Sequence, residues 1–189
     1  MRTAMLPGLK VIAATVAGSV VDTARVEGLA ARLVDMGARA RCLYQGKSEE
    51  ELADVAPYLV PVPPDSDGSK LVFEELWGRS AAIHVVTDLS LTDLRSHLRK
   101  FLMVVTEDGK TLYFRFYDPR VLRVFLPTCT PEQLAEFFGP VSAYYCEDED
   151  PGRALKFSLA EGALQIETID LAVDPNRKPA LKIDWKGRH

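Results

Sequence analysis

The side chains best suited to chemistry lie in one short stretch, Thr111–Arg120, where two arginines flank an aspartate. Guanidinium groups bind carboxylates and phosphates in a bidentate geometry, so Arg115 and Arg120 could together hold an anionic substrate. Asp118 lies between them and is close enough to pair with either arginine and lock the turn, as charged groups beside a strand end usually do. No nucleophile, general base or glycine-rich loop lies nearby, and the structural interpretation is therefore favoured.

An enzyme would have to draw on few further residues. The histidines His84 and His97 complete the plausible catalytic pool, and His84 lies in an apolar run that predicts a buried side chain. The sequence contains no G-x-S-x-G, H-E-x-x-H, phosphate-loop or dinucleotide-binding motif. A small-molecule or anion-binding enzyme using Arg115, Asp118 and Arg120 therefore remains the alternative hypothesis, and no catalytic residue is assigned.

Metal and cofactor sites are not expected. The three cysteines are far apart and lack Cys-x-x-Cys spacing, which predicts free thiols: Cys42, Cys129 and Cys146. Four consecutive acids at 147–150 could attract a cation, but neighbouring side chains of an extended chain point to opposite faces. A solvated acidic loop is favoured there.

The elements that position the arginines are predicted by turn signals. Residues 112–117 are rich in aromatic side chains, which favours a strand. Phe114 and Phe116 alternate with other residue types, so the two phenylalanines are expected on one face of that strand. Asp108-Gly109 joins this segment to the apolar run 101–106 and predicts an antiparallel hairpin. Asp118-Pro119 then predicts the start of a helix, with proline at its first position.

Length and composition favour one domain with a small appendage. The chain has 189 residues, 47% of them hydrophobic, and a net charge of −4, which argues against general nucleic-acid binding. The apolar run at 11–21 is too short to span a membrane. We expect a core domain over 1–148, followed by a C-terminal hairpin and basic tail over 149–189.

The first third of the chain is expected to form a parallel unit. Residues 10–21 predict a strand, 24–36 a helix capped by Thr23, and 41–44 a second strand, which together would make a right-handed crossover. Prolines around 56–62 predict an edge strand or an irregular crossing. The fold class expected is α/β of the α+β mixed kind, a mixed β-sheet flanked by helices, with a C-terminal β-hairpin and tail.

The later elements have clearer boundaries. Ser90 and Thr130 are good helix caps, and Thr130-Pro131 with Gln133 predicts a capping box. Helices are expected at 69–77, 91–100, from 119 and from 131, and strands at 81–86, 141–146, 154–159 and 163–169.

The run FRFYDPR at 114–120 also carries a family resemblance. With Phe137-Phe138-Gly139-Pro140 downstream and Ala56-Pro57-Tyr58-Leu59-Val60 upstream, it resembles the bacterial type VI secretion effector-chaperone (adaptor) family over roughly residues 10–148. The resemblance implies a cytoplasmic chaperone or adaptor that performs no catalysis. Such a protein binds a toxic effector and assists its loading onto the VgrG spike, without a cofactor, nucleic acid or membrane as partner.

Candidate protein-binding residues are the two tryptophans and two tail lysines: Trp77, Trp185, Lys182 and Lys186. Leu181, Ile183 and Trp185 alternate with polar residues, so the tail predicts a two-faced strand with a cationic side. It could dock on the acidic body of its own chain, add a strand to a partner, or remain disordered. Trp77 is more often a packing residue than a binding hot spot.

Overall fold

The computed structural model describes residues 5–106 and 108–172 of the chain, and its centre is an antiparallel sheet. In the described residues this sheet has seven strands in the order β2-β3-β1-β4-β7-β8-β9, and each neighbouring pair runs antiparallel. The strand bounds are β1 Gly18–Asp22, β2 Arg41–Cys42, β3 Pro57–Pro61, β4 Ala82–Thr87, β7 Val141–Glu147, β8 Arg153–Ala160 and β9 Ala163–Asp170.

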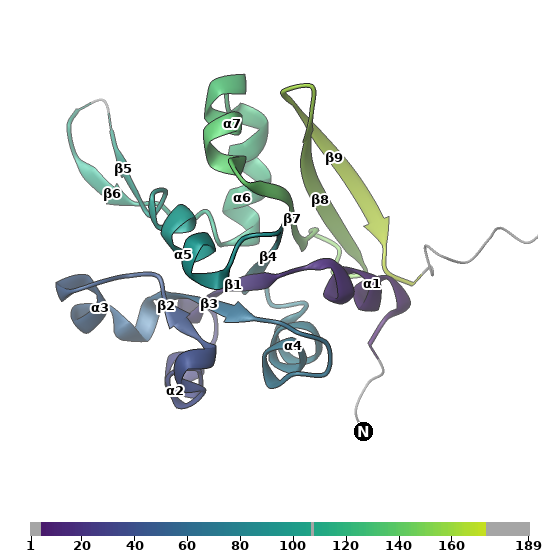
Figure 1. Ribbon diagram of the computed structural model, residues 1–189, viewed down its shortest axis with the longest axis horizontal. Helices are drawn as coiled ribbons and strands as arrows, with labels where there is room; N and C mark the ends of the chain where they lie inside the picture. The colour runs from purple at the N-terminus through teal and green to yellow at the C-terminus, as the bar shows by residue number, and fades with distance from the viewer. Residues whose placement is uncertain (1–4, 107, 173–189) are drawn as a thin grey trace, which may run out of the picture.

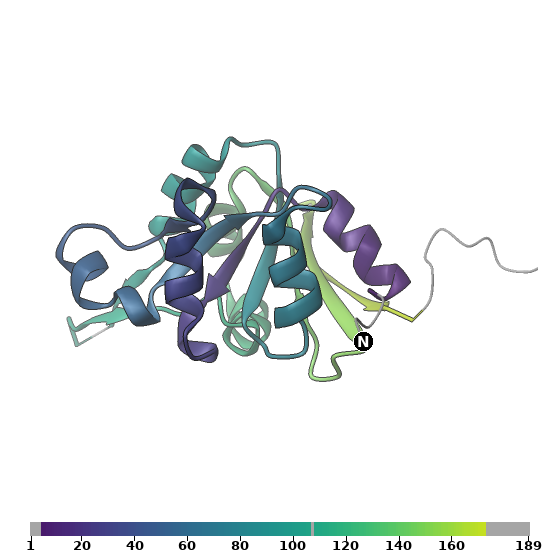
Figure 2. The same ribbon diagram turned by 90° about the horizontal axis from the view of Figure 1, so that it is seen from below.

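Helices cover both faces of the sheet. The first face carries α1 (Pro7–Thr15), α2 (Leu29–Asp35) and α4 (Asp67–Lys70), which lie side by side in Figure 2; α4 continues as a π-helical turn over Leu71–Leu76. The opposite face carries α5 (Leu91–Arg99), α6 (Pro119–Phe125) and α7 (Pro131–Phe138) (Figure 1). The expected α+β class, with its flanking helices and the C-terminal hairpin β8–β9, is confirmed, but the sheet expected to be mixed is antiparallel in every pair of the described residues.

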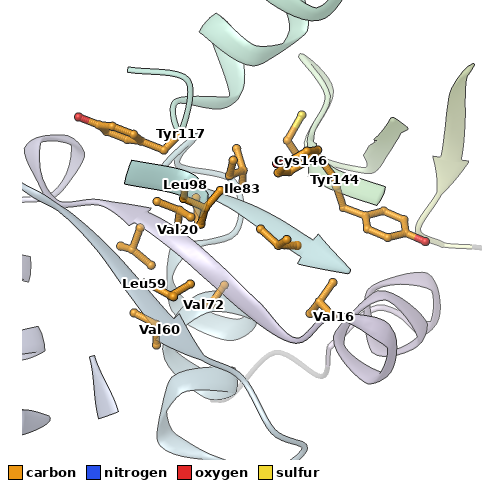
Figure 3. Close-up of a cluster of buried hydrophobic side chains, with 14 of the residues drawn as sticks. Val16, Val20, Leu59, Val60, Val72, Ile83, Leu98, Tyr117, Tyr144 and Cys146 are labelled. Atoms are coloured by element: carbon orange, nitrogen blue, oxygen red, sulfur yellow. The ribbon is translucent and has the colours of Figure 1, made fainter. Parts of the chain in front are cut away.

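The core lies on both sides of the central strands. Val20 and Ile83, on β1 and β4, are fully buried together with Leu59 of β3 (Figure 3). Beyond them an aromatic cluster fills the space beneath α5, α6 and α7, with ring centroids 4.7–6.4 Å apart: Phe101, Phe114, Phe116, Phe125 and Phe137. The two phenylalanines of FRFYDPR therefore anchor this stretch in the core.

The two predicted helix caps, Ser90 and Thr130, are confirmed. The Ser90 hydroxyl accepts a hydrogen bond from the Asp93 amide at the start of α5. Thr130 and Gln133 form the reciprocal capping box of α7. Both signals depend only on residues a few positions apart, and for this reason they could be read from sequence.

The strand expected at 10–21 is wrong in its first half. Residues 7–15 form α1, with Pro7 in its first turn, and the strand begins only at Gly18. Leu9, Ile12 and Val16 are the buried residues of this segment, at the spacing of one helical face. A continuous apolar run fits a buried helix as well as a buried strand, so periodicity did not separate the two.

The helix expected at 24–36 is also broken. A 3₁₀ turn (Thr23–Arg25) and α2 are separated by Gly28, whose φ of 73° is left-handed. Asp22, not Thr23, caps the 3₁₀ turn, and the Thr23 hydroxyl donates to Ala56 O at 2.8 Å. Two further 3₁₀ turns, at Gly37–Arg39 and Ala53–Val55, connect α2 to β2 and α3 (Lys47–Glu51) to β3.

The predicted parallel crossover does not form a strand pair, because β3 lies between β1 and β2. β3 pairs antiparallel with both, so it is an interior strand and neither the edge strand nor the irregular crossing expected from its prolines. Pro57 and Pro61 stand at its two ends, and the short β2 pairs only with Tyr58 and Leu59. Proline has no backbone N–H, and β2 is too short to need a hydrogen bond from either proline position.

A separate hairpin projects from one end of the molecule. β5 (Met103–Val105) and β6 (Thr111–Tyr113) form a two-stranded sheet that extends away from the body, near α3 (Lys47–Glu51) (Figure 1). The predicted hairpin is confirmed, but β6 ends at Tyr113 and not at Tyr117. Phe114 and Phe116 pack in the aromatic cluster of the core, so the chain leaves the hairpin after Tyr113.

Gly68→Ala is expected to destabilise the protein by about 2 kcal/mol, because α4 begins in direct contact with β3. A Cβ atom at Gly68 would meet the backbone oxygen of Pro61 at 2.2 Å, so one of the two elements must shift. Gly152→Ala is the matched control, since its Cβ would meet only the flexible side chain of Asp150. Urea unfolding measures both variants, and an equal effect would contradict the close packing of α4 on β3.

Candidate protein-binding surface

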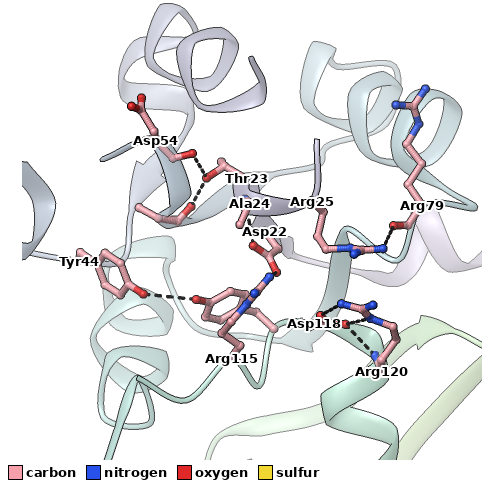
Figure 4. Close-up of polar contacts among 12 residues, drawn as sticks. Asp22, Thr23, Ala24, Arg25, Tyr44, Asp54, Arg79, Arg115, Asp118 and Arg120 are labelled. Carbon is pink, nitrogen blue, oxygen red and sulfur yellow. Dashed lines mark hydrogen bonds and ion pairs between the residues drawn. The ribbon is translucent and has the colours of Figure 1, made fainter. Parts of the chain in front are cut away.

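The first feature of the FRFYDPR stretch is a carboxylate–guanidinium clasp at the start of α6. Asp118 Oδ1 accepts hydrogen bonds from the Arg120 amide and from Arg120 Nε, both at 3.0 Å, and Oδ2 accepts from Arg120 Nη2 at 2.6 Å (Figure 4). One carboxylate thus caps the helix and holds an arginine in bidentate geometry. The Asp118 side chain is 3% exposed and that of Arg120 is 50% exposed.

The second arginine of the stretch reaches a different acid. Arg115 Nη2 donates to Oδ2 of Asp22 at 2.5 Å, across 93 positions of sequence. Asp22 ends β1, and its other oxygen accepts from the Ala24 amide at 3.2 Å. The two arginines therefore bind two different acids: Arg120 pairs with Asp118, and Arg115 pairs with Asp22 (Figure 4). The second pair joins the segment after β6 to the central sheet.

Burial and charge act differently on the two acids. Burial tends to raise the pKa of Asp118, but the hydrogen bonds and charge of Arg120 together bring that pKa below its ordinary value. At Asp22 burial prevails and raises the pKa, and the hydrogen bond and charge of Arg115 offset it only in part. The ionised Asp118 therefore stabilises the fold at neutral pH, whereas the ionised Asp22 carries a cost of desolvation.

This polar centre is occupied by the protein's own groups. Both guanidinium groups already hold a carboxylate, and the buried Tyr117 hydroxyl lies 3.4 Å from that of Tyr44. Burial raises the pKa of Tyr117 far above its ordinary value, so this phenol stays protonated. A substrate anion would find both guanidinium charges already paired with a carboxylate of the chain.

The two histidines of the catalytic pool are engaged in packing. His84 is buried with Nδ1 2.9 Å from the Ser19 hydroxyl, and its ring stacks between Phe73 and Trp77. Burial lowers the pKa of His84 to about 3, so the ring is neutral at physiological pH. His97 Nε2 lies 3.0 Å from Phe137 O, and burial lowers its pKa as well.

An exposed apolar surface is found on the β5–β6 hairpin. Five large apolar side chains are exposed there, which we call the hairpin patch: Met103, Val104, Val105, Leu112 and Tyr113. The strand register places Met103, Val105 and Tyr113 on one face of the hairpin and Val104 and Leu112 on the other. Both faces of the hairpin therefore expose apolar side chains, whereas a sheet packed on a core exposes only one of its faces. Exposed apolar clusters of this kind mark interaction sites.

The base of the hairpin is attached to the body. The Tyr113 ring lies 5.2 Å from that of Tyr44, and its hydroxyl is 3.1 Å from the Ser48 hydroxyl on α3. The Phe114 amide donates to Leu102 O at 2.8 Å, which closes the hairpin at its root. These contacts fix the direction in which the patch projects.

Of the four protein-binding residues proposed from sequence, one lies in the part of the chain that the structure describes. Trp77 is half-buried, stacks on His84 at 5.6 Å and donates its indole N–H to Pro151 O at 2.9 Å. Its contacts tie the Gly78 turn to the loop before β8, and its role in binding stays a prediction. Trp185, Lys182 and Lys186 lie outside the described residues.

The remaining polar groups have local roles. Cys42, Cys129 and Cys146 are free thiols, as expected. Of the acidic run, Glu147 is buried in β7 and its carboxylate accepts from the Ser80 amide at 3.1 Å. Asp148 and Asp150 accept from the amides of Glu149 and Gly152 within the loop that follows.

Sequence reasoning missed the hairpin patch as a surface and missed Asp22 as the partner of Arg115. The signal for the patch was present, because Met103-Val104-Val105 is continuously apolar in a strand of a two-stranded hairpin. A hairpin that small cannot cover both faces of its own strands. No local signal pointed to Asp22.

Comparison with known proteins places the chain in a family. Residues 19–136 match the family model described as "Domain of unknown function (DUF4123)", and the chain belongs to this family. The match includes the hairpin, both ion pairs and the FRFYDPR stretch. The family is associated with adaptors of type VI secretion effectors. No curated protein and no solved structure shows significant similarity to the chain.

Among residues 5–106 and 108–172, no helix has the length and apolar character needed to cross a membrane.

Proposed function

We propose that this protein is an adaptor that binds a toxic type VI secretion effector in the cytoplasm and assists its loading onto the VgrG spike. The observation that carries the proposal is the family match over residues 19–136, since this family is associated with effector adaptors. The match covers the parts of the chain that hold the hairpin patch in place.

The hairpin patch supports this function by its chemistry. Protein interfaces are enriched in aromatic residues and methionine and depleted of charge at their centres. Met103 and Tyr113 provide such a centre on one face of the hairpin, where Val105 extends it, and Val104 and Leu112 offer further apolar surface on the other face. An effector that covered the patch would remove apolar surface from water while the adaptor kept its fold.

We further propose that the protein performs no catalysis of its own. Arg115, Asp118 and Arg120 already form ion pairs, one of which also caps a helix while the other joins two distant segments. His84 and His97 would have to leave stacked or hydrogen-bonded positions in the core. The arrangement is suited to rigidity, and rigidity is useful to a binding surface because less order is lost on association.

The proposal is tested in the native host by tagging the full chain and identifying the protein that co-purifies in stoichiometric amount. We expect that partner to be a secreted effector, and we expect its soluble and secreted amounts to fall when the gene for this chain is deleted and to return when it is restored. An effector whose solubility and secretion do not change on deletion would contradict the adaptor function.

A further inference from the structure

Arg99, in the last turn of α5, has a buried donor without an acceptor. Its Nε–H is shielded from solvent and has no hydrogen-bond partner among the described residues. No carboxylate of the described residues lies within ion-pair distance of its guanidinium group. Arg95, one helical turn earlier, contrasts with it by donating to Cys42 O at 2.7 Å and to Tyr44 O at 3.3 Å. Arg99 therefore holds a positive charge that no acid of the described residues neutralises, and hydrogen bonds from a charged donor to an anion are the strong ones.

Arg99 lines a small cavity at the root of the hairpin patch. The cavity has a volume of about 130 Å³. Its polar lining residues are Gln45, Ser48, Arg99 and Tyr113, and Tyr44, Leu102 and Met103 line its apolar part. This volume is well below the roughly 300 Å³ at which cofactor and drug-sized sites begin, so only the end of a side chain fits. We call it the Arg99 pocket.

The walls of the Arg99 pocket favour an anionic acceptor. The Arg99 guanidinium group provides the positive charge. The hydroxyl groups of Ser48 and Tyr113 are bonded to each other, which leaves one of them free to donate a hydrogen bond to the acceptor. Leu102 and the Tyr44 ring form the apolar part, which excludes water and strengthens the electrostatic attraction. Glu49 on the adjacent α3 is the acid to consider as an internal partner, but it forms no ion pair with Arg99.

We propose that the Arg99 pocket receives the carboxylate of an aspartate or glutamate of the effector, while apolar residues beside that acid cover the hairpin patch. The inference rests on the adaptor function proposed above and adds the chemistry of the segment that is recognised. The acid is held by the guanidinium group, and the patch begins at Met103 and Tyr113, which line the same pocket. A partner segment therefore needs one acid flanked by apolar side chains.

The direct test uses the full chain and two short blocked peptides, Ser-Val-Glu-Val-Ser and the same peptide with glutamine in place of glutamate. The arginine Nε–H signals in ¹H–¹⁵N NMR spectra report binding at Arg99, and their assignment comes from Arg99→Lys. We expect the glutamate peptide to shift the Arg99 signal to saturation and the glutamine peptide to bind about tenfold more weakly or less. Equal responses to both peptides would overturn the proposal.

Arg99→Gln and Lys100→Gln form a matched pair for the captured effector. Each removes one positive charge, but the exposed Lys100 does not line the pocket. We expect Arg99→Gln to weaken effector capture by about tenfold and Lys100→Gln to leave it nearly unchanged, with wild-type melting curves for both. If Arg99→Gln captured the effector as well as wild type, the pocket would be refuted and the adaptor function would stand. If wild type itself retained no effector, the adaptor function would be refuted.

Discussion

Asp118→Ala is expected to lower the free energy of unfolding by about 2 to 4 kcal/mol, the largest effect of any single substitution in the clasp. The change removes the cap of α6, worth about 1 kcal/mol, and the acceptor of a bidentate ion pair. The Arg120 guanidinium group is half-exposed and can return to water, which keeps the loss below that of a fully buried pair. Urea unfolding at neutral pH, followed by circular dichroism, measures the change.

Asp118→Asn separates the cap from the charge. Asparagine caps helices as well as aspartate does, so we expect this variant to lose only about half as much stability as Asp118→Ala. An Asp118→Ala protein that unfolded like wild type but lost its partner would contradict the structural role and make Asp118 an interface residue.

The difference between wild type and Asp118→Asn should also depend on pH in a defined direction. The folded-state pKa of Asp118 lies below the ordinary value of 3.8, so its carboxylate stabilises the fold above that value. That advantage must disappear as the pH falls below 3.8 and through the folded pKa. Unfolding curves at a series of pH values should therefore converge in acid. A difference that persisted at the lowest pH would show that the charge of Asp118 is not its source.

The second large effect concerns the hairpin patch. We expect Val105→Thr combined with Leu112→Thr to raise the Kd of the effector complex at least about tenfold, because two apolar side chains on opposite faces lose their favourable burial. Threonine keeps good strand propensity, and Val105 is already 72% exposed, so the fold should be unaffected. Titration calorimetry with the purified effector gives the Kd of both proteins.

Val124→Thr is the control for this pair. Val124 is as exposed as Val105 but lies on α6, outside the hairpin patch. Its substitution should leave the Kd within about twofold of wild type, as expected for a residue outside an interface. Similar losses from the control and from the hairpin pair would remove the special role of the patch.

Features set by residues close together in the sequence could be predicted, and features set by distant segments could not. Caps such as Ser90 and Thr130, and the Asp108-Gly109 hairpin turn, are local and were predicted correctly. The apolar run at 10–21 was not, because its burial is consistent with either a helix or a strand. The position of β3 between β1 and β2 is decided by which partners the finished sheet offers, and prolines at the strand ends concealed it.

In the candidate site, too, contacts between neighbouring residues could be predicted and contacts between distant segments could not. The motif around Asp118 was visible because Arg120 is two positions away, whereas the partner of Arg115 is 93 positions distant. The hairpin was predicted, but an apolar strand pattern does not reveal whether another layer covers it. The Arg99 pocket could not be predicted, since only the folded chain brings Ser48 and Tyr113 beside Arg99.

Hydrogen–deuterium exchange of the full chain, alone and in complex with its effector, tests most directly whether the hairpin is the binding surface of a rigid body. We predict that amide exchange slows in peptides covering 103–105 and 111–113 when the effector is bound, and that peptides covering Asp22 and Asp118 exchange slowly in both states. Unchanged exchange in the hairpin, with new protection confined to other parts of the chain, would contradict the proposed surface.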